Sequence, residues 1–318
     1  MEDKRLAVVT GGNRGIGFEI CRQLALKGVE VILTSRNQDG GVKAVEKLNI
    51  SGLTNVVFHQ LDIKDPSSIA CLAKFIETRF KKLDILVNNA AEVGIIIQDQ
   101  EEFRTGGGFL QLVDERAEFL SHVVEELYES GEECLKTNYY ATKTLTEALI
   151  PLLHVSKSPR IVNLTSMHGD LYWFHNDKVK EELQAIETLT EERIDDIIQR
   201  FLLDFKNGKL KENGWPLTLS AYKVSKATLN AYTRLLARKY KNIIVNCVHP
   251  GYVLTDMTSQ TGFSTAEQGA KGPVKAALLP DDGPSGVCFY ETEIAPFESP
   301  DLPLKIKHYF QGIKFLVL

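Results

Sequence analysis

The chain has 318 residues, of which 43% are hydrophobic and 25% charged, and its formal net charge is −5. This composition predicts a globular protein with one large α/β domain or two small ones, and it excludes a largely disordered chain. The acidic balance and the lack of a long basic run argue against a nucleic-acid partner, which needs a clustered cationic surface.

Seven short apolar segments alternate with helical patterns along the chain. Such alternation is typical of a parallel sheet with crossover helices. The segments are continuously apolar, which suits strands that are buried on both faces. We therefore predict a doubly wound, Rossmann-type α/β fold. The predicted strands are 6–9, 31–33, 56–58, 85–87, 161–164, 243–248 and 287–290.

Two polar segments, 92–136 and 170–216, interrupt the alternation, and we interpret them as insertions into a single domain that spans residues 1–297. The first begins with a glycine-rich piece at 106–108 and continues as an acidic stretch that we expect to form loop and helix. Residues 298–318 form a C-terminal extension, which is either a packing arm or an uninformative addition.

The second insertion contains a distinct helix signal. Thr190 followed by two glutamates marks a helix start. Apolar residues then recur at helical spacing, which predicts that one face of this helix is buried. These residues are Ile194, Ile197, Ile198, Phe201 and Leu202.

A glycine-rich turn joins the first predicted strand to the first helix. Gly11 is expected to permit the turn, Gly15 to let phosphates approach the main chain, and Gly17 to let the helix pack closely. Strand, turn and helix in this order present backbone N–H groups to a pyrophosphate, whereas the glycines alone would indicate only a tight turn. The predicted dinucleotide contacts here are Gly11, Asn13, Arg14, Gly15, Ile16 and Gly17.

The second strand ends without the carboxylate that an NAD enzyme uses to bind the ribose 2′-hydroxyl. Arg36 follows this strand, and together with Arg14 it is expected to bind a 2′-phosphate, which favours NADPH. Either arginine alone would be read as a solvated surface charge. Asp62, at the end of the third strand, is predicted either to cap the next helix or to accept a hydrogen bond from adenine.

The pattern Y-x-x-x-K occurs twice, at Tyr139/Lys143 and Tyr222/Lys226. Residues four apart share one helix face, so in either pair the lysine can stabilise the phenolate form of the tyrosine. The second pair follows a strand that delivers Ser166 at its carboxyl end, where ligands of parallel sheets bind. We therefore favour Tyr222 and Lys226.

Six motifs in order resemble the short-chain dehydrogenase/reductase family, and nearly the whole chain to about residue 297 takes part. They are Thr10-Gly11-x-x-x-Gly15-x-Gly17, Asn88-Asn89-Ala90, Asn138, Ser166, Tyr222-x-x-x-Lys226 and Pro250-Gly251-x-Val253-x-Thr255. The long insertion before the tyrosine, the Asn213–Pro216 segment and the Pro280–Gly286 segment are similar to the plant subgroup that includes salutaridine reductase and the menthone reductases. Ala91 departs from the glycine usual in the family, and we expect the extra methyl to be tolerated.

The resemblance implies specific catalytic roles. Tyr222 would donate a proton to the substrate oxygen while the nicotinamide delivers hydride to the carbonyl carbon. Lys226 would depress the pKa of Tyr222 and bind the nicotinamide ribose, and Ser166 would hydrogen-bond the carbonyl oxygen. Asn138 would hold a water molecule that links Lys226 to solvent.

The remaining cofactor contacts also follow from the resemblance. Thr255 either touches the nicotinamide carboxamide or caps a helix. Besides the glycine turn and Arg36, the predicted cofactor contacts are Asp62, Ile63, Asn89, Tyr222, Lys226, Pro250, Gly251, Val253 and Thr255.

We predict an NADPH-dependent carbonyl reductase that converts a small hydrophobic ketone, by resemblance monoterpenoid or alkaloid-like, to the secondary alcohol. Residues 171–174, Leu-Tyr-Trp-Phe, form either an apolar lid over the carbonyl or simply core of the insertion. The alternatives are reduction of a conjugated C=C bond and a catalytically silent NADPH-binding regulator. By resemblance, the second insertion covers the helices through which many relatives pair, so we predict a monomer.

The remaining features concern metals, redox state and location. The histidines lack metal-ligand spacing, so no metal is expected. The charged residues 2–5 lead directly into the first strand, and no apolar run is long enough to span a membrane, so we expect neither a signal peptide nor membrane association, and a cytosolic location. The cysteines form no C-x-x-C pair and are expected to be reduced, mostly core thiols. They are Cys21, Cys71, Cys134, Cys247 and Cys288.

Overall fold

The structure, a computed structural model, describes residues 4–112 and 122–299. Its centre is an eight-stranded sheet in the order β10-β9-β8-β7-β4-β1-β2-β3, in which only the β10–β9 pair is antiparallel. This is the doubly wound α/β fold predicted from the sequence. The strands are β1 Leu6–Val9, β2 Glu30–Ser35, β3 Val56–Gln60, β4 Ile85–Asn88, β7 Arg160–Leu164, β8 Ile244–His249, β9 Cys288–Tyr290 and β10 Glu293–Ala295.

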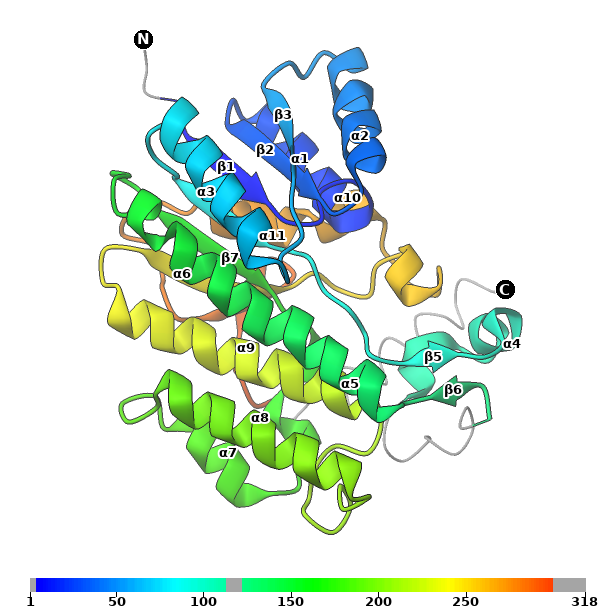
Figure 1. Cartoon of the computed structure of the whole chain (residues 1–318). Helices are drawn as coiled ribbons and strands as arrows, with labels where there is room; N and C mark the ends of the chain where they lie inside the picture. The colour runs from blue at the N-terminus through cyan, green and yellow to red at the C-terminus, as the bar shows by residue number, and fades with distance from the viewer. Residues whose placement is uncertain (1–3, 113–121, 300–318) are drawn as a thin grey trace.

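Helices cover both faces of the sheet (Figure 1). On one face α1, α2 and α11 pack on the strands, and on the other face α3, α6 and α9 do so. The strands are buried from both sides because their residues are apolar at successive positions. These helices are α1 Gly15–Leu26, α2 Gln38–Ile50, α3 Pro66–Arg79, α6 Thr142–Leu153, α9 Ser220–Lys239 and α11 Lys271–Ala277.

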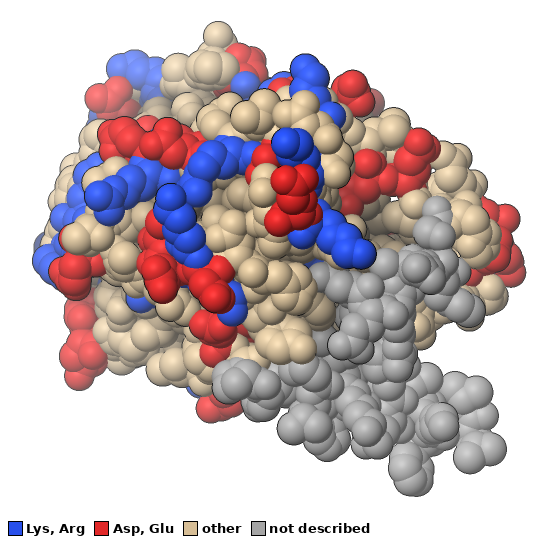
Figure 2. All heavy atoms as spheres, turned by 90° about the horizontal axis from the view of Figure 1, so that it is seen from below, with Lys and Arg blue, Asp and Glu red and all other residues tan. Residues whose placement is uncertain are grey.

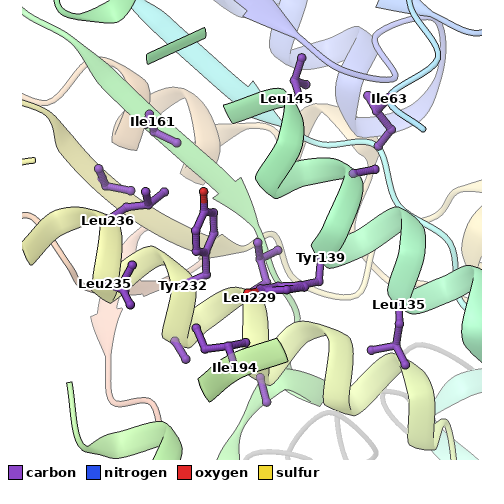
Figure 3. Close-up of a cluster of buried hydrophobic side chains, with 14 of the residues drawn as sticks. Ile63, Leu135, Tyr139, Leu145, Ile161, Ile194, Leu229, Tyr232, Leu235 and Leu236 are labelled. Atoms are coloured by element: carbon purple, nitrogen blue, oxygen red, sulfur yellow. The ribbon is translucent and has the colours of Figure 1, made fainter. Parts of the chain in front are cut away.

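The larger of the two main cores lies between α6, α9 and the sheet (Figure 3). Tyr139 and Tyr232 are fully buried there, with their rings edge to face at a centroid distance of 5.8 Å. Leu229, Leu235 and Leu236 of α9 complete the same cluster. This packing fixes the position of α9, which carries the predicted catalytic tyrosine and lysine.

The sheet order places a binding crevice at one edge of the fold. Strand β1 lies between β2 and β4, so the chain leaves β1 in one direction and later returns to its other side. In doubly wound sheets, ligands bind at such a switch point, outside the carboxyl ends of the strands. The glycine turn follows β1 at this place.

The first insertion forms a small unit of its own beside the sheet. A two-stranded antiparallel ribbon pairs Ile96 with Glu125 and Ile97 with Val124, and it packs with Phe103 and Phe109 in a separate apolar cluster. The helix predicted here is present, but the short strands β5 and β6 were not predicted. The elements are β5 Ile96–Ile97, α4 Gln100–Thr105, η1 Gly108–Gln111, β6 Val124–Glu125 and α5 Tyr128–Leu135.

The second insertion contains α7 Asp177–Gln184 and α8 Glu191–Lys206, which lie beyond α9 (Figure 1). Thr190 is the N-cap of α8, and its side chain accepts a hydrogen bond from the Arg193 N–H at 3.3 Å. The five apolar residues predicted to share a face of this helix are all buried. On the face of the molecule seen from below, acidic and basic side chains are interspersed (Figure 2).

The start of the predicted C-terminal extension packs against the second insertion. Glu298 forms an ion pair with Lys180 at 3.1 Å, and the Ser299 N–H donates to the Asp170 carboxylate at 3.1 Å. The rest of the extension, from residue 300, lies outside the described residues.

Cysteine burial largely follows expectation. All five thiols are free, and four are buried, but Cys71 is exposed because it lies on the outer side of α3. Within 4–112 and 122–299, no helix combines the length and apolar character needed to cross a membrane.

Candidate active site

The glycine turn adopts a conformation that only glycine accommodates easily. Gly11 and Gly15 have φ values of 63° and 55°, in the left-handed region. A Cβ atom at Gly17 would lie 2.3 Å from the Gly11 carbonyl oxygen. The start of α1 can therefore approach the turn closely, which leaves its N-terminus facing the crevice.

A cleft of about 640 Å³ runs along the carboxyl ends of the strands, from the Arg36 region to Tyr222. Its volume, its glycine turn and the two arginines in its wall fit a dinucleotide. Most of the predicted cofactor residues line it: Gly11, Asn13, Arg14, Gly15, Ile16, Gly17, Arg36, Asp62, Ile63, Asn89, Tyr222, Lys226, Pro250 and Thr255.

Two predicted cofactor residues lie elsewhere. Gly251 and Val253 line a smaller adjoining pocket rather than the cleft, because the chain turns away from the sheet after Pro250. Both lie close in the chain to Pro250 and Thr255, which line both cavities, and their contact with the cofactor stays a prediction. Thr255 lines both cavities and is also the N-cap of the short helix η6 Asp256–Thr258, so both roles considered for it are compatible with the structure.

Asn89 ties the end of β4 to the glycine turn. Its side-chain amide donates to the Thr10 carbonyl oxygen at 2.7 Å and to the Gly11 carbonyl oxygen at 3.2 Å. The Thr10 hydroxyl in turn accepts from the Asn89 and Ala90 N–H groups, both at 2.9 Å. These bonds hold Ala91, the departure from the family pattern, in the cleft wall.

Asp62 does not cap the following helix. Its carboxylate accepts from the Lys64 N–H at 2.9 Å, while Asp65 caps α3 by accepting from the Ser67 N–H. The capping alternative is therefore wrong. Asp62 lines the cleft, and the adenine alternative stays a prediction.

Both arginines predicted to bind a 2′-phosphate line the cleft and are paired with carboxylates. Arg14 lies 2.9 Å from Asp256, and Arg36 lies 3.5 Å from Glu92. Neither acidic partner was identified from the sequence, because both ion pairs join segments far apart in the chain.

Three of the predicted catalytic side chains meet where the cleft joins the smaller pocket. They are Tyr222, Lys226 and Ser166. Strand β7 delivers Ser166 just past its end, and Lys226 Nζ donates to the Leu164 carbonyl oxygen of the same strand at 2.9 Å. Lys226 Nζ lies 5.6 Å from the centre of the Tyr222 ring. Ser166 lines the smaller pocket together with Tyr222, and its hydroxyl accepts from the His168 N–H at 3.2 Å. The predicted convergence of hydroxyl, phenol and ammonium is therefore present.

Burial shifts the pKa values of both Tyr222 and Lys226. Burial raises the pKa of Tyr222, and the hydrogen bond with Ser166 only partly offsets this effect. Burial also lowers the pKa of Lys226 to about 8. Burial is therefore the largest influence on the pKa of Tyr222 here, and its depression by Lys226 stays a prediction.

Asn138 lies behind the cleft wall rather than in it. Its side chain accepts from the Glu92 N–H and donates to the Glu92 carbonyl oxygen, both at 2.8 Å, and it also donates to Ser225 at 2.9 Å. It belongs to a π-helical stretch, η3 Lys136–Ala141, of a kind frequent at functional sites. The side-chain amide holds the backbone of Glu92, and the water-holding role of Asn138 stays a prediction.

The other Y-x-x-x-K pair is structural. Tyr139 is fully buried in the core, and Lys143 forms an ion pair with Asp195 at 3.0 Å. Neither residue lines the cleft or the smaller pocket. The choice of Tyr222 and Lys226 over this pair agrees with the geometry.

The smaller pocket, of about 100 Å³, has a mostly apolar wall. The Tyr252 hydroxyl accepts from the Phe109 N–H at 3.1 Å, which links the first insertion to the loop after β8. Residues 171–174 do not form its lid, since Leu171, Trp173 and Phe174 are buried in the main core. The apolar lining residues are Ile16, Val93, Phe109, Met167, Pro250, Tyr252, Val253 and Met257.

Several lining residues were missed by the sequence reasoning. Thr165 directly follows a predicted strand, and Ser35 and Ala90 lie within about three residues of one, near the carboxyl ends where ligands bind in this fold. Phe109 and Met257 carry no such signal, because only tertiary packing brings their segments to the pocket.

Tyr222 lines both cavities, so a phenol stands between a dinucleotide-sized cleft and an apolar pocket. This arrangement is that of a nicotinamide-dependent oxidoreductase. The model for short chain dehydrogenases matches residues 5–177, and the chain belongs to this family. The model named enoyl-(acyl carrier protein) reductase matches residues 210–289.

Similar proteins include plant reductases. The chain is 50% identical to (+)-neomenthol dehydrogenase from Arabidopsis thaliana, over 93% of this chain and 99% of that protein. The solved structure of salutaridine reductase from Papaver somniferum matches with a TM-score of 0.82 at 49% identity, over 90% of this chain and 99% of that one. A more distant relative, carbonyl reductase (NADPH) 3 from Mus musculus, is 38% identical over 87% of this chain and 92% of its own length.

Proposed function

We propose that the protein is an NADPH-dependent carbonyl reductase that converts a small hydrophobic ketone, of the monoterpenoid or alkaloid-like class, to a secondary alcohol. The observation that carries this proposal is the position of Tyr222, which lines both the cleft and the apolar pocket and shares the latter with Ser166. The names of the plant relatives support the substrate class.

The chain's own groups account for proton supply and orientation. NADPH, when bound, supplies a hydride to the carbonyl carbon. Because burial raises the pKa of Tyr222, its phenol stays protonated at neutral pH and can donate to the oxygen as negative charge develops. The Ser166 hydroxyl, held by the His168 N–H, is placed to hydrogen-bond the same oxygen.

The character of the smaller pocket supports an uncharged substrate. Its wall is mostly apolar, and burial lowers the pKa of His249 to about 3, so this imidazole stays neutral at working pH. A charged substrate would lose hydration here without gaining an opposite charge.

The proposal is tested with a panel of monoterpenoid and alkaloid ketones, measuring NADPH absorbance and analysing the products. We expect at least one cyclic hydrophobic ketone to yield its secondary alcohol. An α,β-unsaturated ketone in the panel separates this activity from C=C reduction. If the saturated ketone is the product, the double-bond alternative replaces carbonyl reduction.

The proposed preference for NADPH depends on Arg36. Replacing this residue in Arg36→Ala removes a charge-assisted bond worth about 1.5–3 kcal/mol. NADPH binding is therefore expected to weaken roughly ten- to hundredfold, with little change for NADH. Fluorescence titration with both cofactors measures the difference, and Arg104→Ala, on exposed helix α4, is the control. Equal losses for NADPH and NADH would contradict the 2′-phosphate assignment.

We also propose that the protein is a monomer in the cytosol. Helices α7 and α8 pack against the core around α9, so this face is already covered within one chain. Sedimentation velocity at micromolar concentration is expected to give a single species with the mass of one chain. A stable dimer would refute the proposal.

A further inference from the structure

An ion pair crosses the floor of the cofactor cleft. Arg36 follows β2 and Glu92 follows β4, and β1 with its glycine turn lies between these two strands. Arg36 Nη1 and Glu92 Oε1 are nevertheless 3.5 Å apart. The contact therefore joins the two sides of the switch point, which is where a dinucleotide would bind.

Glu92 is held in place by the core and not by its surface ion pairs alone. Asn138, which is 1% exposed, binds both the N–H and the carbonyl oxygen of Glu92 at 2.8 Å. The Cys134 thiol donates to the same carbonyl oxygen at 3.3 Å. The backbone that carries this carboxylate is thus fixed, while the side chain itself is 32% exposed and lines the cleft.

The Glu92 carboxylate also lies near a second cation of the cleft. Lys64 Nζ is 4.0 Å from Glu92 Oε1 and 2.9 Å from the Glu133 carboxylate. One carboxylate therefore partly neutralises both Arg36 and Lys64, and an anion that binds to either cation is repelled by Glu92 at short range.

We propose that Glu92 is an affinity-determining residue of the cofactor site, whose carboxylate competes with the 2′-phosphate of NADP(H) for Arg36 and thereby weakens binding and speeds product release. The inference rests on the proposed use of NADPH. The competition is specific for the phosphorylated cofactor, because NADH carries no group that replaces Glu92 at this guanidinium. Faster release matters where product release limits turnover.

The test is Glu92→Gln, which keeps the side-chain size and leaves the backbone contacts with Asn138 in place. Removing one negative charge within a few ångströms of a partly exposed phosphate site is expected to lower the Kd for NADPH and NADP⁺ about three- to tenfold at low salt. The Kd for NADH should change by less than about twofold, because its bound form lacks the repelled group. Fluorescence titration of the full chain at two ionic strengths gives these values.

Glu77→Gln is the matched control. Glu77 pairs with Lys74 on the exposed side of α3, and neither residue lines the cleft. Its Kd values for both cofactors should match the wild type. Circular dichroism melting establishes that both variants are folded before binding is compared.

The remaining outcomes overturn the inference. Weaker NADPH binding by Glu92→Gln would mean that the carboxylate orients Arg36 for the phosphate, and an unchanged Kd would mean that it has no effect. Equal tightening for NADH would show a general charge effect without competition at the 2′-phosphate. Failure of the proposed cofactor is a separate result: the wild-type chain would then bind NADH as tightly as NADPH, whatever the variant does.

Discussion

Tyr222→Phe is expected to lose ketone reduction by about a hundredfold to ten-thousandfold, the usual range for removal of a positioned general acid. The substitution removes one oxygen atom and keeps the ring between the cleft and the smaller pocket. Because the phenol is the group that supplies the proton, kcat should fall, while the Kd for NADPH should stay within about twofold of the wild type. Single-turnover absorbance measurements and fluorescence titration provide the two values.

The second tyrosine of the same spacing provides the matched control. Tyr139→Phe also removes one hydroxyl from a Y-x-x-x-K pair, but its ring is buried in the core between α6 and α9 (Figure 3). This variant should reduce the ketone at close to the wild-type rate. Full activity in Tyr222→Phe, or an equal loss in both variants, would refute the assignment of the proton donor.

Local sequence features predicted the parts of the fold that depend on neighbours in the chain. The predicted strand 6–9 and the observed strand Leu6–Val9 coincide, because four apolar residues directly before a glycine turn leave little freedom for another structure. The helix after Thr190 was likewise predicted with its cap and its buried face. Strand Glu293–Ala295 was missed, since a three-residue edge strand is too short to give a periodic signal.

Site residues could be predicted from the sequence where their type and their position at a strand end or on one helix turn indicate a function. Tyr222, Lys226 and Ser166 were found in this way. The partners of Asn138, Arg14 and Arg36 were not, because each contact joins segments separated by 46 or more positions in the chain. Burial was a second limit, since the spacing of Tyr222 and Lys226 says nothing about desolvation, which sets the direction of both pKa shifts.

The raised pKa of Tyr222 affects its proposed role at neutral pH. A phenol with a raised pKa holds its proton until an alkoxide develops nearby, which suits proton donation to a reacting carbonyl. The same phenol is a poor base, so oxidation of the alcohol needs a higher pH.

Lys226→Met is expected to reduce kcat/KM for ketone reduction by about a hundredfold to ten-thousandfold, because it removes the buried ammonium beside Tyr222. Burial lowers the pKa of Lys226 to about 8, so the ammonium is present below this pH and is lost as the pH rises through it. The wild-type kcat/KM should therefore be level below about pH 8 and should fall above it. Because the pKa of Tyr222 is raised, its phenol does not titrate in this range.

Lys226→Arg separates the charge of Lys226 from its other contacts. A guanidinium keeps its proton up to about pH 12, so in this variant the fall in kcat/KM should move to higher pH, even if the larger group lowers the rate. Lys143→Met, in the structural Y-x-x-x-K pair, should keep the wild-type pH profile, because Lys143 is paired with Asp195 away from both cavities. An alkaline limb that stays near pH 8 in Lys226→Arg would show that another group titrates there, and it would remove the assigned role of the lysine charge.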